Sequence, residues 1–269
     1  MSQEKSGFNA VPGADLDLLK MPAHWLLARM GKTVLRPGGL RLTRKLLELL
    51  DINSTDEVAE FAPGLGRTAR LILDRGPESY IGIERDIAAK DWSERHLPSR
   101  FGASVALGSA ENTGLPGESR SVVIGEAMMT MNPHVKKRQI IGEAFRLLKP
   151  AGRFGIHELC LGRDNHSHEI ERDLQNVLKV GARPLSQAEW SGLLTAAGFK
   201  VRHIVIAPMD LLRPARVLED EGWIGGFRIA RNVIFNPIAR RRVLAIARTL
   251  ERHRSELNAI AIVAEKSSR

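Results

Sequence analysis

The sequence predicts an α/β fold built on a seven-stranded, mostly parallel sheet with helices on both faces. Between Val58 and Leu159, short runs rich in β-forming residues alternate with segments of helical periodicity, which is the pattern of right-handed β-α-β units. The chain has 269 residues, of which 43% are apolar, enough for one large domain or two small ones. Helices before the first strand and a helical insertion before the last strand complete the expected fold.

Seven segments are expected to form the strands. Five of them lie in the alternating region, and two follow it toward the C-terminus. Their ranges are Glu57–Phe61, Ser79–Glu84, Ser104–Leu107, Ser121–Gly125, Gly152–Glu158, Lys200–Ala207 and Leu257–Glu265.

Start and stop signals place two of the helices. Apolar residues recur at helical spacing from Ile140 to Leu148, and Pro150 ends that helix because it cannot continue the hydrogen-bond ladder. Further along, Ser186 can cap a helix that runs to Ala197, because its hydroxyl can accept a hydrogen bond from the first turn. Both helices connect predicted strands.

The segment between the last two predicted strands is long and amphipathic. Its apolar residues lie on one helical face, while Arg241, Arg248 and Arg252 lie on another. We expect it to form a helical layer that closes over the site. The chain then divides into an N-terminal segment with cap helices (1–50), a core (51–210), the insertion or lid (211–256) and a final strand with the tail of the core (257–269).

The charge and composition bound the compartment and the partners. The formal net charge is +9, and residues 21–50 and 211–256 carry +5 each, so the rest of the chain is nearly neutral. A basic surplus favours nucleic acid, anionic lipid or an acidic substrate as partner. The single cysteine, Cys160, excludes an internal disulfide, and no secretory signal or membrane-length apolar run is visible. We expect a soluble, cytoplasmic protein, and the sequence leaves its oligomeric state open.

A glycine-containing turn follows the first predicted strand. Gly64 and Gly66 lack side chains, so a ligand can approach the backbone N–H groups where the next helix begins. Ala69 supplies the third small residue of a dinucleotide motif, so the turn alone leaves a nicotinamide enzyme open. Glu84 ends the second strand, where a carboxylate can accept hydrogen bonds from both hydroxyls of a ribose. Together these residues predict a nucleoside site.

Several segments, in order, resemble the class I methyltransferases, which bind S-adenosylmethionine. Glu60 stands two residues before a small-x-Gly-x-Gly turn, as in the first motif of that family. Glu84, the segment 108–111 and the turn 146–153 follow in the order of the family's later motifs. The resemblance covers about residues 36–160 and is closest to the bacterial small-molecule enzymes of the type 11 kind.

The resemblance implies a Rossmann-like fold, S-adenosylmethionine as cofactor and a small or medium-sized methyl acceptor, with S-adenosylhomocysteine as product. Pro37-Gly38-Gly39 is similar to a tripeptide that lies near the cofactor in several members. Ala62 and Ala151 depart from the family's usual glycines, and Ser109 replaces an aspartate that receives the adenine amino group, so this uncharged hydroxyl should bind more weakly. The implied cofactor site consists of Glu60, Phe61, Ala62, Pro63, Gly64, Gly66, Glu84, Arg85, Ser109, Ala110, Glu111 and Glu126.

Methyl transfer from a sulfonium needs no covalent catalyst, because the methyl group is already activated. The protein must align the acceptor and exclude water, and a general base is useful only where the acceptor loses a proton. Ligands of parallel sheets lie at the carboxyl ends of the strands, which makes Glu126, His157 and Glu158 the candidate catalytic residues. His157 and Glu158 are neighbours on one strand and face opposite ways, so we expect one of them in the site. Methionines within 128–131 are candidates for an acceptor pocket or for the core.

Two other functions and a metal site are alternatives to this hypothesis. Enzymes of this class that methylate base amino groups carry a Pro-Pro-aromatic motif after the fourth strand, where residues 125–128 read Gly-Glu-Ala-Met, so RNA is the weaker enzyme hypothesis. A protein that binds the cofactor without turnover is the third. The segment 166–169 (His-Ser-His-Glu) would place two histidines together only if it were extended, and we expect no metal. The clustered arginines predict an acceptor, or a carrier of it, that bears a carboxylate or phosphate.

Overall fold

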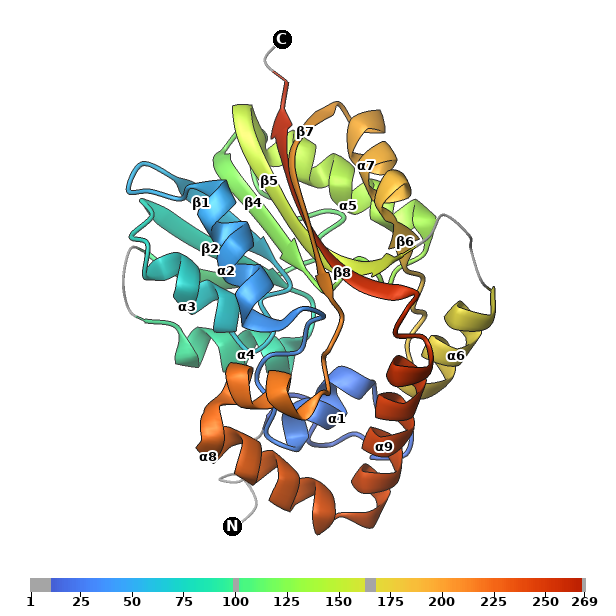
Figure 1. Cartoon of the computed structure of the whole chain (residues 1–269). Coiled ribbons are helices and arrows are strands. Elements are labelled where there is room, and N and C mark those ends of the chain that lie inside the picture. Colours follow the sequence, from blue (N-terminus) through green and yellow to red (C-terminus); the bar gives the residue numbers. More distant parts are fainter. Residues whose placement is uncertain (1–10, 99–101, 163–167, 268–269) are drawn as a thin grey trace.

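The computed structural model describes residues 11–98, 102–162 and 168–267 and contains a single mixed sheet (Figure 1). The strands are β1 (Glu57–Phe61), β2 (Ser79–Glu84), β3 (Ser104–Leu107), β4 (Arg120–Glu126), β5 (Leu148–Leu161), β6 (Leu185–Ser186), β7 (Phe199–Pro208) and β8 (Leu257–Lys266). They lie in the order β3-β2-β1-β4-β5-β8-β7, with β6 paired to β5 beside this path. All pairs are parallel except those of β8, which runs antiparallel between β5 and β7.

The predicted seven-stranded, mostly parallel sheet is confirmed, with two differences. Strand β5 begins at Leu148, before the predicted Gly152, because a bulge opposite β4 lets the chain enter the sheet early. Pro150 lies in that bulge, where its missing N–H is tolerated. The short strand β6 was not predicted, since Leu185–Ser186 is too short to carry a periodic pattern.

Two of the nine helices of the described residues begin or end at the signals predicted from the sequence. Ser186 caps α7 and forms a reciprocal capping box with Glu189, while α5 ends at Leu147, before Pro150. The helices are α1 (Ala23–Arg29), α2 (Gly39–Leu50), α3 (Arg67–Leu73), α4 (Ile87–His96), α5 (His134–Leu147), α6 (His168–Leu178), α7 (Gln187–Ala196), α8 (Pro214–Ile234) and α9 (Pro237–Arg252).

Helices cover both faces of the sheet. On one face Ile140 of α5 and Trp190 of α7 belong to a core that includes Phe154 of β5. On the other face Leu46 of α2 and Ile72 of α3 pack in a second core with residues of β1 and β4. Helix α2 lies in the range expected for cap helices, yet its apolar stripe is buried against the sheet.

A cap of helices lies beyond the carboxyl ends of the strands (Figure 1). It consists of α1, α6, α8 and α9, and it has a third apolar cluster of its own that includes Leu26 of α1, Leu174 of α6 and Ile246 of α9. Arg241 and Arg248 of α9 are exposed, so the amphipathic pattern expected for the insertion is observed. In the described part of the chain no helix is both long and apolar enough to span a membrane. The cap faces the carboxyl ends of the parallel strands, which is where ligands of such sheets bind.

The bulge of β5 generates a prediction about stability. Ala151 adopts φ 60°, a left-handed conformation in which a side chain is strained and glycine is not. We expect Ala151→Gly to raise the free energy of unfolding by about 1 kcal/mol, measured by urea denaturation. Gly152→Ala is the matched control and should destabilise, because its Cβ would lie 2.8 Å from the carbonyl oxygen of Lys149. A neutral or destabilising Ala151→Gly would contradict the assignment of strain to this residue.

Candidate functional site

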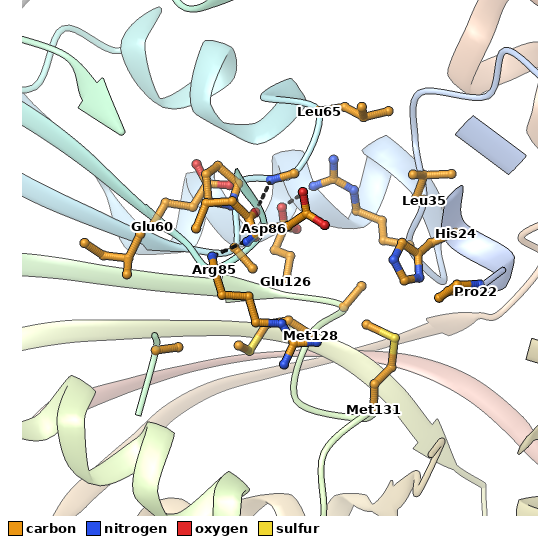
Figure 2. A pocket seen from close by; sticks show the side chains of 18 of the residues that line it. Pro22, His24, Leu35, Glu60, Leu65, Arg85, Asp86, Glu126, Met128 and Met131 are labelled. Carbon is orange, nitrogen blue, oxygen red and sulfur yellow. Dashed lines mark hydrogen bonds and ion pairs between the residues drawn. The ribbon is translucent and has the colours of Figure 1, made fainter. Parts of the chain in front are cut away.

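A cavity of about 590 Å³ lies between the carboxyl end of the sheet and the cap (Figure 2). The loops after β1, β2, β3 and β4 form its sheet-side wall, and residues of α1 and of the segments flanking it form the wall toward the cap. In Figure 2 Glu60 and His24 lie on opposite sides of Glu126. All residues of the predicted cofactor site line this cavity except Phe61, Gly66 and Ser109.

The turn after β1 presents its backbone to the cavity. Gly64 and Gly66 have φ of 55° and 72°, and a Cβ on Gly64 would meet only the carbonyl oxygen of Ala62, at 3.9 Å. The turn is anchored to β2 by a 2.8 Å hydrogen bond from the Ala62 N–H to the Ile83 carbonyl. Ala62 itself has φ 53°, so the residue that departs from the family's glycine occupies a left-handed position, as Ala151 does. Open space beside Gly64 leaves room for a ligand against the main chain.

Glu84 joins the ends of β1 and β2. Its carboxylate accepts hydrogen bonds from the backbone N–H groups of Gly64 (3.2 Å), Arg85 (2.9 Å) and Asp86 (3.1 Å). Burial raises the pKa of this carboxyl group, and the three N–H groups oppose that effect. Each carboxylate oxygen has more than one acceptor site, so Glu84 can also accept from a ligand in the cavity that it lines.

Glu60 lines the same cavity. Burial raises its pKa to about 8, although the Tyr80 hydroxyl donates a 2.7 Å hydrogen bond to Oε2 and opposes the rise. The carboxyl group is therefore mostly protonated at neutral pH and can donate a hydrogen bond. Phe61, the next residue, is fully buried in the core, so its side chain does not reach the cavity as predicted.

The wall after β3 holds the third part of the predicted site. Ala110 and Glu111 line the cavity, and Glu111 pairs with Lys136 at 2.9 Å. Burial would raise the pKa of Glu111, but hydrogen bonds from Ser109 and Lys136 outweigh it and lower the pKa to about 2. The Ser109 hydroxyl is thus engaged with Glu111, and Ser109 does not line the cavity. Gly66 also lies outside the lining, as the residue that caps α3.

Glu126 at the end of β4 is the centre of a buried polar network. Its Oε1 accepts hydrogen bonds from the Thr43 hydroxyl (2.8 Å) and faces His157 Nδ1 (2.7 Å). Its Oε2 accepts from Arg36 and Thr68. Burial alone would raise the pKa of Glu126, but the charge of Arg36 and the hydrogen bonds from His157 and Thr68 lower it to about 2. Glu126 is therefore a carboxylate at every physiological pH.

His157 and Glu158 occupy places other than the one the sequence suggested. Both are fully buried, and neither lines the cavity. His157 lies between Glu126 and the Pro37 carbonyl, which its Nε2 faces, so it orients the network. Glu158 points the other way, as strand geometry requires, and binds the loop after β4 through the N–H groups of Met128, Met129 and Thr130 at 2.7–3.0 Å. The position of His157 and Glu158 next to each other on a strand predicted that their side chains point in opposite directions, but not which groups each would contact.

The wall toward the cap includes residues that sequence reasoning missed. His24 lines the cavity from α1, and its pKa is lowered to about 4 by burial first and then by the charge of Arg85, so the imidazole is neutral at physiological pH. Trp25 stacks at a tilt against it, with 4.7 Å between the ring centroids. Met128 and Met131 line the cavity too, whereas Met129 is buried in the core. Nothing in the spacing of the N-terminal residues marks His24 as a site residue, because it reaches the sheet only through the fold.

The loops beside the methionines are held by a buried cation. Lys137 Nζ donates hydrogen bonds of 2.8 Å to the carbonyls of Asn132 and Arg183. Burial lowers the pKa of Lys137 to about 8, and the charge of Glu158 opposes the change. Asn132, Val180 and Gly181 line the cavity, so Lys137 holds this part of its wall without lining the cavity itself.

The cations of the cavity differ from those that the sequence singled out. Arg241, Arg248 and Arg252 do not line it, and Arg252 pairs instead with Asp173 of α6 at 3.4 Å. The arginines that do line it are Arg36, Arg67 and Arg85, and Arg67 Nε is buried without a hydrogen-bond partner.

The metal hypothesis finds no support in the described residues. They contain no cluster of three or more residues suited to hold a metal ion. Of the histidine pair considered for a metal, His166 lies outside the described residues together with Ser167, and His168 begins α6.

Comparison with known proteins identifies one clear sequence relative. The chain is 30% identical over 214 residues, 78% of its length, to a protein of Haemophilus influenzae described as uncharacterized, of which it covers 85%. The chain belongs to the family of this Haemophilus influenzae protein. No family model matches the sequence. The family assignment thus rests on sequence identity, and solved structures provide the comparison of the fold.

Solved structures share the fold at low identity. Haemonchus contortus phosphoethanolamine N-methyltransferase 2, solved with S-adenosyl-L-methionine, is 15% identical with a TM-score of 0.71, covering 91% of this chain and 56% of that one. The cyclase SpnF is 16% identical with a TM-score of 0.67, covering 85% and 82%. The Rossmann-like fold expected from the resemblance is thus confirmed for this family member.

The network around Glu126 predicts a pH dependence of stability. Its folded pKa of about 2 lies below the ordinary 4.5, so its stabilisation is present above pH 4.5 and is lost as the pH falls toward 2. We expect Glu126→Gln to cost about 3 kcal/mol at pH 7, and the difference from the unmodified protein to shrink between pH 5 and pH 3. Urea denaturation across this range measures both. Parallel stability curves for the two proteins would contradict the role of the carboxylate.

Proposed function

We propose that the chain is an S-adenosylmethionine-dependent methyltransferase that acts on a small or medium-sized acceptor, of the type 11 kind. The observation that carries the proposal is the convergence of Glu84 and the open turn at Gly64 on one cavity that also contains the charged Glu126. The shared fold of a phosphoethanolamine methyltransferase supports it. SpnF shares that fold and is named a cyclase, so the site and not the fold bears the argument.

The residues fit the cofactor in chemistry and in space. Bound S-adenosylmethionine would supply an activated methyl group on a sulfonium. Glu84 would accept hydrogen bonds from the ribose hydroxyls, and the turn at Gly64 would admit the aminoacyl half against its backbone. Arg67, whose Nε lies buried and unpartnered, suits a carboxylate, and the charge of Glu126 suits the cationic part. Ala110 and Glu111 would border the base.

The wall toward the cap would hold the acceptor. His24 is a neutral imidazole in the cavity and would accept a hydrogen bond from the acceptor, but its pKa of about 4 makes it a weak base for removing a proton. Trp25, Met128 and Met131 supply apolar contact and exclude water. An anionic acceptor remains part of the proposal, but its partner would be Arg85 rather than the arginines of the insertion, because Arg36 is already paired with Glu126.

Turnover is tested by incubating the protein with metabolite extracts and cofactor labelled in its methyl group. We expect S-adenosylhomocysteine to form and label to appear in a small molecule. Label in the RNA fraction of total RNA would favour an RNA methyltransferase instead. Calorimetric binding of the cofactor without product from any extract would identify a protein that binds and does not turn over.

Glu84→Ala tests the cofactor site directly. We expect the dissociation constant for S-adenosylmethionine to rise by an amount equivalent to about 1 to 3 kcal/mol, because the ribose hydroxyls lose their acceptor. Isothermal titration calorimetry measures it. Glu78→Ala is the matched control, since Glu78 is exposed at the other end of β2 and should leave binding unchanged. An unchanged dissociation constant for Glu84→Ala would remove Glu84 from the site.

A further inference from the structure

The second half of α8 is inverted relative to an ordinary surface helix. Large apolar side chains point outward after the kink at Gly222, with exposed fractions of 81% for Trp223, 87% for Ile224 and 74% for Phe227. The stripe continues through Ile234 and Phe235, which are also exposed. Surface helices normally direct such residues to the core and polar residues to water.

The inward side of this half-helix combines glycines and an asparagine with two half-buried aliphatic residues, Ile229 and Val233. Gly225 is buried, Gly226 and Ile229 are half-buried, and the Asn232 amide donates a 3.1 Å hydrogen bond to the Met30 carbonyl at the end of α1. Two glycines and an asparagine therefore pack against the protein while a tryptophan and two phenylalanines face solvent. An exposed apolar cluster of this size marks an interaction surface.

The charge around this surface has one sign. Residues 222–250 contain six arginines and no acidic residue. Arg228 and Arg231 are exposed between the turns that carry Phe227 and Phe235, and the Arg228 guanidinium donates a 3.3 Å hydrogen bond to the Gly31 carbonyl; Arg240 and Arg241 are exposed at the start of α9. We call the exposed residues Trp223, Ile224, Phe227, Arg228, Arg231, Ile234 and Phe235 the outer face of α8.

We propose that the outer face of α8 docks onto the surface of an anionic phospholipid bilayer. Aromatic and aliphatic side chains flanked by arginines fit the boundary between acyl chains and negatively charged headgroups. A second copy of the chain is disfavoured as the occupant, because two surfaces with this excess of arginine would repel each other across a symmetric interface. The negatively charged headgroups of such a bilayer would attract the arginines, and its acyl chains would take up the apolar side chains.

The kink at Gly222 separates the docking half of α8 from an anchoring half. Before the kink, Asp220 accepts a 2.9 Å hydrogen bond from the Leu40 N–H, and Glu221 accepts hydrogen bonds of 2.8 and 2.9 Å from the N–H groups of Thr33 and Val34. The docking half lies at the end of the molecule away from the sheet, beside α1 (Figure 1). Binding to a bilayer there leaves the fold intact and does not depend on the proposed reaction.

Sedimentation of the full chain with lipid vesicles tests the proposal. We expect the protein to sediment with vesicles of phosphatidylglycerol and phosphatidylcholine in equal parts, and to bind phosphatidylcholine vesicles weakly. Trp223→Ala combined with Phe227→Ala should weaken binding by about tenfold or more, and Arg231→Gln with Arg241→Gln should reduce its dependence on salt. Ile87→Ala with Val135→Ala and Arg44→Gln are the matched controls, because these residues are exposed on other helices and should leave binding unchanged.

Three results would overturn the proposal. The first is no binding to anionic vesicles, and the second is equal binding by the Trp223/Phe227 double variant when circular dichroism shows that it is folded. The third is a dimer in size-exclusion chromatography that Phe227→Ala dissociates, which would make a second copy the occupant. Cofactor binding measured on the same double variant should be unchanged, so loss of docking is distinguishable from failure of the proposed methyltransferase.

Discussion

The carboxylate of Glu126 is the constraint on which the rest of the site depends. A buried charge is tolerated only where partners replace the water that it has lost, and here those partners come from four separate segments. Arg36 precedes α2, Thr43 lies on α2, Thr68 lies on α3 and His157 lies on β5. Any arrangement that displaces one of them leaves an uncompensated charge in the core. The network therefore selects one geometry for the carboxyl end of the sheet, where the turn after β1 and the end of β2 also open.

Helix α8 of the cap belongs to the same constraint, although it lies far along the chain from Arg36 and Glu126. Asp220 of α8 binds the first turn of α2 through the Leu40 N–H, and Glu221 binds the segment at Thr33. These contacts hold the stretch that presents Arg36 to Glu126. Lys32, fully buried beside both carboxylates, sits where its charge is offset by two acids at 3.6 to 3.7 Å. Helix α8, which is inserted before the last strand, thus holds in place the stretch that carries Arg36. Substitutions in this helix and at the site are therefore expected to have effects on stability that do not simply add.

Sequence reasoning succeeded where a local pattern carries the information and failed where only the fold does. Most strand positions, the turn at Gly64 and the position of Glu84 at the end of β2 follow from short-range periodicity and turn chemistry, whereas the early start of β5 at Leu148 does not. His24 and Arg36 are brought to the cavity by packing between segments far apart in the chain, which no local pattern encodes. Glu158 was a candidate because it is a carboxylate near a strand end. In the structure its oxygens accept hydrogen bonds from three backbone N–H groups of the loop after β4, which no local pattern revealed.

The two walls of the cavity come from different parts of the fold. The wall on the sheet is built from the elements that define the fold, which SpnF and a phosphoethanolamine methyltransferase share with this chain. It therefore governs whether a nucleoside fits, but not what happens to it. The wall on the cap is built from α1 and its neighbours, where a neutral His24 and Trp25 face the cavity. Helix α8 packs directly on the end of α1, where the Asn232 amide donates a hydrogen bond to the Met30 carbonyl, so the position of this wall depends on the packing within the cap. Under the proposed function, the residues that select the acceptor would therefore lie on the wall toward the cap.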